Sequence, residues 1–377
     1  MTSTTHREEC SAAALYVAVE LSTKEWWLTM STAPGAKRVR MRVRPGDRDG
    51  IGTALGQAKV RCGLVATVPV RTCYEAGRDG FWPHRLLATL GVTNVVVDSS
   101  SIEVPRRARR AKTDRLDGEK LLRLLLRYWG GEWDCWQVVH VPTPAAEDAR
   151  HASRSLTTLQ QERTRYRNRI HSFLALHGVA KLRIDDRFAA RLAAARDWAG
   201  EPLGAALQAR LLETWRLLQA VETERRARRR AERARVIGAA TASDAIAHQL
   251  THLGGVAARA ATVLADELFS RDLRNRRQVG ALTGLVSAPY QSGETSLDQG
   301  LSRSGLPAVR RIAVQLAWAW LRYQPTSALS RWYHERFGRS SPGQRRLGIV
   351  ALARRLMIAL WRYVTMGVVP EGAVLKA

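Results

Sequence analysis

The chain has 377 residues, with 60 Lys and Arg against 34 Asp and Glu and a formal net charge of +26. It is therefore too long for one average domain and too basic for an ordinary metabolic enzyme. Its 45% hydrophobic residues are enough to form cores, which excludes a disordered basic tail, and its charge favours nucleic acid as the partner.

The sequence also argues against a membrane protein and against a protein stabilised by disulfides or by zinc-binding cysteines. No apolar run approaches the roughly 18 to 20 residues that cross a bilayer, and the opening MTSTTHREECSAAALYVAVEL lacks the pattern of a signal peptide. We therefore expect a soluble, cytoplasmic protein without membrane contact. The four cysteines contain no CxxC pair, which predicts neither a disulfide framework nor a zinc ribbon; they are Cys10, Cys62, Cys73 and Cys135.

The first hundred residues alternate strand and helix patterns. The segments ALYVAVEL, WWLTMST and KRVRMRVR predict three short strands between Ala14 and about Val43. A helical stretch to about Val60, a strand ending RTCYEAG, the helix FWPHRLLATLG and the strand VTNVVVD follow. A meander followed by βαβα predicts a mixed sheet flanked by helices, an α/β architecture.

Strand patterns vanish between Pro142 and about Gly238. Two long helical patterns in this region, the second with sequence LGAALQARLLETWRLLQAVETERRARRRAERARVI, predict a helical hairpin or coiled coil. Seven arginines between Arg225 and Arg235 form either a solvated helix face or a phosphate-tracking surface.

The remainder of the chain is helical with one interruption. The segment 281–311 loses helical periodicity for roughly twenty residues, which predicts an irregular loop, and a loop of that length inside a domain is usually functional.

Four acidic residues stand where a sheet edge would collect them. Glu20 ends the first strand and Glu75 follows RTCY, although strands disfavour acids. Asp114 and Asp117 begin a helix at i and i+3, so they project from one face; taken alone, they also suit the helix dipole without any ligand. Converging at one edge, the four carboxylates would make a site suited to magnesium or manganese.

Several motifs resemble those of a known family. VAVELSTKEW, CYEAGRDGFWPHRLL, RRARRAKTDRLDGEKLL and GLVSAPYQSGE with GLSRSGLPAVRR resemble the successive motifs of DEDD-type insertion-sequence transposases, bridge-RNA-guided serine recombinases related to Piv DNA invertases. The resemblance covers nearly the whole chain. It implies an α/β RNase-H-like (RuvC-like) catalytic domain over residues 1–140, a helical coiled-coil region over 141–238 and a mainly α-helical transposase domain over 239–377.

The resemblance also implies a metal site. Its ligands would be Glu20, Glu75, Asp114 and Asp117, with Mg²⁺ as the ion and Mn²⁺ as a substitute. The family's first acid is usually aspartate, whereas this chain has Glu20, which is one methylene longer.

Ser292 in YQSG matches the family's nucleophile. A covalent serine–phosphate ester preserves the energy of the cleaved DNA bond for rejoining, and the metal steadies the reacting phosphoryl group. The serine and the acids fall in separate predicted domains, so we expect domain closure or sites shared between protomers of a dimer or tetramer. Without the resemblance, the simpler interpretation of Ser292 is a turn serine that caps its own backbone, and Ser296, Ser302 and Ser304 are rivals as the nucleophile.

The expected partners are donor and target DNA together with a structured noncoding guide RNA. No groove-reading module is evident in the sequence, which agrees with target choice by base pairing. The basic run before Asp114 is suited to phosphate contacts. The nucleic-acid-binding residues we expect are Arg106, Arg107, Arg109, Arg110, Lys112, Arg303 and Arg310. The family implies a bacterial, nucleoid-associated protein.

Two other functions stay open at this stage. A RuvC-like nuclease or junction resolvase would use the same acids to activate water and would need no serine. A domesticated, non-catalytic nucleic-acid-binding protein would carry Glu20 as the mark of a decayed site.

Overall fold

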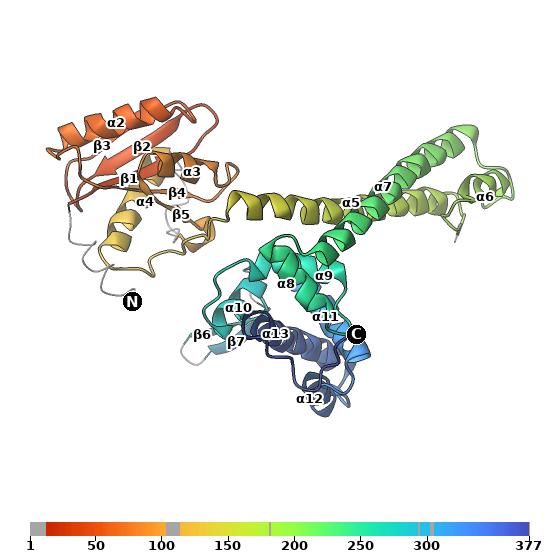
Figure 1. Cartoon of the computed structure of the whole chain (residues 1–377). Helices are drawn as coiled ribbons and strands as arrows, with labels where there is room; N and C mark the ends of the chain where they lie inside the picture. Colours follow the sequence, from red (N-terminus) through yellow and green to blue (C-terminus); the bar gives the residue numbers. More distant parts are fainter. Residues whose placement is uncertain (1–12, 103–113, 181, 293–294, 302–304, 377) are drawn as a thin grey trace. The chain divides into compact units, whose positions relative to one another are not determined.

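The computed structural model describes residues 13–102, 114–180, 182–292, 295–301 and 305–376 (Figure 1). The chain divides into two units, Met1–Val141 and Pro142–Ala377. The first unit is built on a five-stranded sheet, and the second consists mainly of helices.

The sheet of the first unit has the strand order β3-β2-β1-β4-β5. Its strands are β1 (Leu15–Glu20), β2 (Trp26–Ser31), β3 (Val39–Val43), β4 (Val70–Glu75) and β5 (Thr93–Val97). The first three strands are antiparallel neighbours, whereas β4 runs parallel to β1 and β5 runs parallel to β4. The predicted meander and the mixed α/β architecture are confirmed.

Helices cover both faces of this sheet (Figure 1). They are α2 (Arg48–Arg61), α3 (Trp82–Thr89) and α4 (Asp114–Trp129), with a short 3₁₀ turn, η1 (Ser99–Ser101), after β5. Leu15 and Val17 of β1 belong to the core shared with α2 and α3, while Tyr16 and Ala18 pack with Leu125 of α4. Burial on both faces explains why β1 is an uninterrupted apolar run.

The second unit begins with a helical hairpin, as predicted. It consists of α5 (Pro144–Leu176), α6 (Phe188–Ala194) and α7 (Ala205–Gly238), with α6 at the far end of the two long helices (Figure 1). Ile170 and Leu174 of α5 share a core with Leu211 and Leu218 of α7. The apolar positions three and four residues apart on each helix form this seam.

Ion pairs from arginines to two buried carboxylates attach the hairpin to the helices that follow it. The first of those helices are α8 (Ala242–Thr251), α9 (Ala258–Leu264) and the π-helical turn η2 (Ala265–Phe269). Arg235 of α7 contacts Asp266 Oδ2 at 3.0 Å, and Arg154 of α5 contacts Glu267 Oε1 at 3.2 Å. Both carboxylates are buried, so the two ends of the hairpin are fixed to one turn.

The C-terminal helices surround a second core. They are α10 (Arg276–Thr283), α11 (Pro307–Tyr323), α12 (Ala328–Phe337) and α13 (Pro342–Met366). Helix α13 is central, since Leu352, Leu356 and Leu360 are fully buried along one side. Ser341 and Gln344 form a capping box at its start, which fixes where the helix begins.

One sequence-based expectation is wrong. The segment after α10 is not an irregular loop, because β6 (Ser287–Ser292) and β7 (Thr295–Leu301) form an antiparallel hairpin. Backbone hydrogen bonds between the two strands hold this segment in a regular structure, although its side-chain pattern does not indicate strands.

Candidate active site and basic pocket

Glu20 and Glu75 end two neighbouring parallel strands. Ala18 of β1 lies opposite Cys73 of β4, and each strand ends two residues further on, at Glu20 and Glu75. Because side chains alternate along a strand, both acids continue the face of the sheet lined by Ala18 and Cys73. That face is the one on which α4 packs.

The first turn of α4 approaches the same edge. A Cβ atom built at Gly118 would lie 3.8 Å from Glu20 Oε2 and 2.8 Å from Thr29 Oγ1. Asp117 is the residue before this contact and is half-buried. Asp114 is the first residue of α4, but its side chain lies outside the described part. The fold thus brings the start of α4 to Glu20, and glycine allows the close approach.

Burial and the nearby acid Glu75 change the pKa of Cys73 on the same face of the sheet. Burial raises the pKa of the Cys73 thiol well above its usual range, and the charges of Glu75 and Cys135 raise it further. The thiol therefore stays protonated and neutral, and the negative potential of Glu75 extends into the core beneath α4.

The donor set suits a hard cation, since carboxylate oxygens are the ligands that Mg²⁺ and Mn²⁺ prefer. Within the described residues, no three His, Cys, Asp or Glu side chains are grouped closely enough to make a ready metal site. Glu20, Glu75 and Asp117 share an edge without forming a closed cage.

Ser292 lies in the second unit. It is the last residue of β6, and its backbone pairs with Thr295 at the start of β7. Ser296, a rival nucleophile, pairs with Gln291 one step further from the end of the hairpin. The rivals Ser302 and Ser304 lie outside the described residues. By register, Ser292 occupies the end of the hairpin.

Most of the predicted nucleic-acid-binding residues are not described. Arg106, Arg107, Arg109, Arg110, Lys112 and Arg303 fall in the segments outside the described ranges. Arg310 is in the first turn of α11, where its Nε donates to the carbonyl oxygen of Thr283 at 3.4 Å. This contact also helps to terminate α10, because Thr283 is the last residue of that helix.

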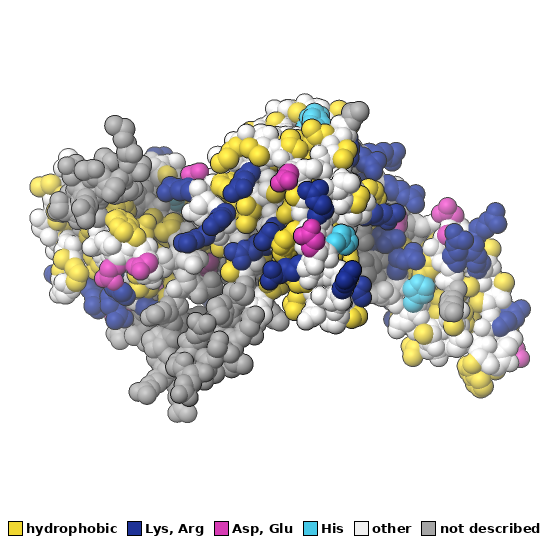
Figure 2. Space-filling view, turned by 90° about the horizontal axis from the view of Figure 1, so that it is seen from below, with side chains coloured by type: hydrophobic (Ala, Val, Ile, Leu, Met, Phe, Trp, Pro, Cys, Tyr) yellow, Lys and Arg dark blue, Asp and Glu magenta, His cyan; other side chains and the backbone are white. Residues whose placement is uncertain are grey.

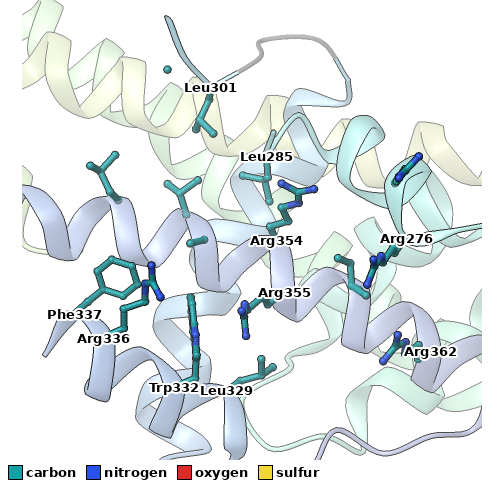
Figure 3. A pocket seen from close by; sticks show the side chains of 16 residues that line it. Arg276, Leu285, Leu301, Leu329, Trp332, Arg336, Phe337, Arg354, Arg355 and Arg362 are labelled. Atoms are coloured by element: carbon teal, nitrogen blue, oxygen red, sulfur yellow. The ribbon is translucent and has the colours of Figure 1, made fainter. Parts of the chain in front are cut away.

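Sequence reasoning missed a basic pocket in the second unit. The pocket has a volume of about 1010 Å³ and is lined by residues of α10, α12 and α13 and the end of β7 (Figure 3). On the face of the molecule seen in Figure 2, Lys and Arg side chains recur, with few Asp and Glu among them. The arginines of the pocket are scattered along the sequence from Arg276 to Arg362, so no local motif predicts that they line one pocket.

A folded chain with a formal net charge of +26 has the charge of a nucleic-acid-binding protein. Comparison with known proteins narrows the class. Residues 247–332 match the sequence family described as "Transposase IS116/IS110/IS902 family". The end of α8, the whole of α9 to α11 and part of α12 lie within these residues.

Three curated proteins are similar to the chain. A putative transposase, y4rJ, of Sinorhizobium fredii (strain NBRC 101917 / NGR234) is 41% identical over 378 residues, covering 96% of this chain and 95% of the relative. Putative transposase y4qE of the same strain is 29% identical, covering 67% and 59%. The transposase for insertion sequence element IS1328 of Yersinia enterocolitica is 28% identical, covering 61% and 68%. The chain belongs to the IS116/IS110/IS902 family of transposases.

Membership of this family makes the chain a transposase of an insertion sequence, a protein that acts on DNA. Among the helices of the described residues, none is both long and apolar enough to span a bilayer.

Proposed function

We propose that this transposase cuts and rejoins DNA under the guidance of a structured noncoding RNA, through a covalent phosphate ester on Ser292. The observation that carries the proposal is the meeting of Glu20, Glu75 and the first turn of α4 at one edge of the sheet. These residues match the acidic motifs of DEDD-type transposases, related to Piv DNA invertases, which pair such acids with a serine nucleophile.

The sheet supports an RNase-H-like, RuvC-like assignment for residues 1–140. Its order β3-β2-β1-β4-β5, with an antiparallel meander and two parallel strands, is the arrangement that such domains use. In this proposal, residues 141–238 form the coiled-coil region and residues 239–377 form the transposase domain with the serine. The family match over residues 247–332 falls in the last of these.

The acids Glu20, Glu75, Asp114 and Asp117 would hold Mg²⁺, with Mn²⁺ as a substitute. The ion, when bound, supplies positive charge that polarises the phosphoryl oxygens of the DNA. In this proposal the strand ends and the helix start would bring the four carboxylates together around the ion, and their mutual repulsion would favour binding of a cation.

Ser292 performs the covalent step. Its hydroxyl oxygen forms a bond to phosphorus and its proton passes to the surrounding water, while the bond from phosphorus to one deoxyribose oxygen breaks and that oxygen is protonated. The ester keeps the cleaved bond's energy. Attack by the hydroxyl of a second strand end then rejoins the DNA and restores the serine.

The partners follow from the charge. A formal net charge of +26 supports binding to nucleic acid, since phosphate backbones are anionic, and the proposed partners are donor DNA, target DNA and the guide RNA. The guide would supply sequence recognition by pairing, and the protein would recognise shape and phosphate. We propose a dimer or tetramer, because the mechanism handles several strand ends together.

The serine is tested by trapping. Full-length protein with Mg²⁺, the element's noncoding RNA and a nicked suicide substrate is expected to form a protein–DNA adduct whose phosphate maps to Ser292. The variant Ser292→Ala should form no adduct and exchange no strands, because it lacks only the nucleophilic oxygen. The matched control Ser287→Ala, at the other end of β6, should keep both activities.

Other outcomes are equally informative. An adduct on Ser296, Ser302 or Ser304 would move the nucleophile, whereas cleavage by Ser292→Ala without any adduct would point to a nuclease that activates water. Absence of Mg²⁺-dependent cleavage in the unaltered protein would favour a non-catalytic nucleic-acid-binding protein.

Two substitutions, one at a proposed ligand and one at a control position, test the metal site. Asp117→Asn should abolish Mn²⁺ binding in isothermal titration, together with cleavage, because a neutral amide is a weaker ligand. Asp49 also lies in the first turn of a helix, α2, and is exposed, so Asp49→Asn should change neither. Unchanged Mn²⁺ binding in Asp117→Asn would exclude Asp117 as a ligand.

A further inference from the structure

The basic pocket combines an arginine rim with an apolar floor. Its guanidinium groups come from Arg276, Arg277, Arg336, Arg354, Arg355 and Arg362. Its apolar lining comes from Leu285, Leu329, Trp332, Phe337, Val350 and Ile358. In Figure 3 the labelled arginines and the rings of Trp332 and Phe337 are arranged around one hollow.

The arginines of the pocket carry uncompensated charge. None of the six forms an ion pair with a carboxylate of the described residues. The guanidinium of Arg355 instead stacks over the Trp332 ring, 4.0 Å from its centroid. Arg354 is half-buried and lies against α10, with Nε 3.4 Å from a Cβ built at Gly280. Concentrated positive charge of this kind attracts an anion.

The floor offers flat contact surfaces beside that charge. Trp332 and Phe337 of α12 meet edge to face with centroids 5.7 Å apart. Trp332 is half-buried, so part of its surface remains open to the pocket. Aromatic rings and guanidinium planes both stack on unpaired bases, whereas the phosphates of the same strand need cations.

We propose that this pocket binds an unpaired nucleotide of a single-stranded nucleic acid, with the base against Trp332 and Phe337 and the flanking phosphates on the arginine rim. Its volume of about 1010 Å³ is at the upper end of pockets that enclose a drug-sized molecule. A base within a duplex cannot enter it, because its faces are already stacked. The proposal concerns binding alone and does not depend on Ser292 as the nucleophile.

The base contact is tested by measuring the binding of fluorescent oligonucleotides, ten nucleotides long, to the full-length protein. We compare oligo(dT), oligo(U) and an abasic DNA strand of the same length and charge. Trp332→Leu should weaken oligo(dT) binding by about fivefold or more, since stacking contributes at least ~1 kcal/mol per base, and should leave abasic binding unchanged. The matched control Trp318→Leu alters a 52% exposed tryptophan of α11 outside the pocket and should bind like the unaltered protein.

The phosphate contact has a second pair of variants. Arg354→Gln with Arg362→Gln should weaken binding of oligo(dT) and of the abasic strand alike. The slope of log affinity against log salt should become shallower by about 1.4, because two phosphate contacts, and the release of their counterions, are lost. If Trp332→Leu does not fold, Arg355→Gln removes the stacked cation without opening a cavity and should also reduce the discrimination between oligo(dT) and the abasic strand.

A crosslink locates the base directly. A probe with one 5-iododeoxyuridine should crosslink to the tryptic peptide of residues 332–336. Preferential binding of oligo(U) or of oligo(dT) identifies RNA or DNA as the natural source, and both support the pocket. Crosslinks only to peptides that contain neither Trp332 nor Phe337 would overturn the proposal. Unchanged base discrimination in the variants would overturn it as well, as would equal displacement by polyglutamate, which would indicate an acidic peptide as the ligand.

Discussion

The contact between α4 and the sheet makes a sharp prediction at Gly118. A Cβ atom there would lie 2.8 Å from Thr29 Oγ1, closer than unbonded heavy atoms normally approach, and Thr29 is fully buried in β2. Gly118→Ala must therefore displace the first turn of α4 or the threonine. Either shift disturbs the edge that holds Glu20.

The magnitude follows from two opposing effects. Alanine in a helix is favoured over glycine by about 1 kcal/mol, whereas one extra methyl group in a packed site costs about 1–3 kcal/mol. Gly52 is the fifth residue of α2, as Gly118 is of α4, and a Cβ there would meet nothing within 4 Å. Relative to Gly52→Ala, Gly118→Ala should lower stability by about 1–3 kcal/mol.

Hydrogen exchange in the full-length protein measures this difference within the first unit alone, through the opening free energies of β1 and α4. A double-mutant cycle adds the cause. Thr29→Ala removes the obstructing oxygen. The remaining neighbours, the Cβ position of residue 29 at 3.7 Å and Glu20 Oε2 at 3.8 Å, are at ordinary contact distance, so Gly118→Ala should cost much less in that background. Equal effects of Gly118→Ala and Gly52→Ala, or a cost that Thr29→Ala leaves unchanged, would refute the packing argument.

Two further predictions concern the helical hairpin. Arg259 of α9 donates to Glu232 Oε1 at 3.0 Å and makes three further hydrogen bonds to α5, so Arg259→Ala should lower the free energy of unfolding by ~3 kcal/mol. Arg228→Ala, which breaks an exposed pair on α7, should cost only about 0.3–0.5 kcal/mol in the same denaturation experiment; similar losses in both would contradict the buried network. Burial raises the pKa of Glu222, but hydrogen bonds from Arg163 and Arg225 outweigh it and hold the pKa below the usual 4.5. Its contribution to stability is therefore present above pH 4.5 and lost as pH falls through the lower folded value. Glu222→Gln should flatten this part of the melting-temperature profile between pH 6 and pH 3, and an unchanged profile would exclude the pair as its cause.

The elements of the first unit were predictable because their signals are local. Its strands are short apolar runs bounded by turns, and its first helix, α2, begins at the capping residue Asp47, which accepts from Gly50 N at 2.8 Å. The hairpin β6–β7 gave no such signal. SAPYQS and TSLDQGL contain Pro289 and Gly300 and do not alternate polar and apolar residues, so the pairing register could not be inferred from either strand alone.

Some residues of the candidate site were predictable from local sequence patterns, and others were not. Glu20 and Glu75 were predictable because acids are unusual at the ends of apolar strands, and parallel pairing brings such ends together. The importance of Gly118 depends on the distance between α4 and β2, which no spacing in the sequence reveals. The pocket arginines come from three helices, and only tertiary packing gathers Arg276 and Arg362 around one hollow.

The length of the hairpin of α5 and α7 would amplify a small rotation at its base. At 1.5 Å per residue, the 34 residues of α7 extend roughly 50 Å, so a tilt of about 10° at the base carries the tip through about 9 Å. The base is held by Arg235 and Arg154 on the buried acids of η2. A rotation of that one turn would therefore be multiplied along the hairpin, and α6 at its tip would travel farthest.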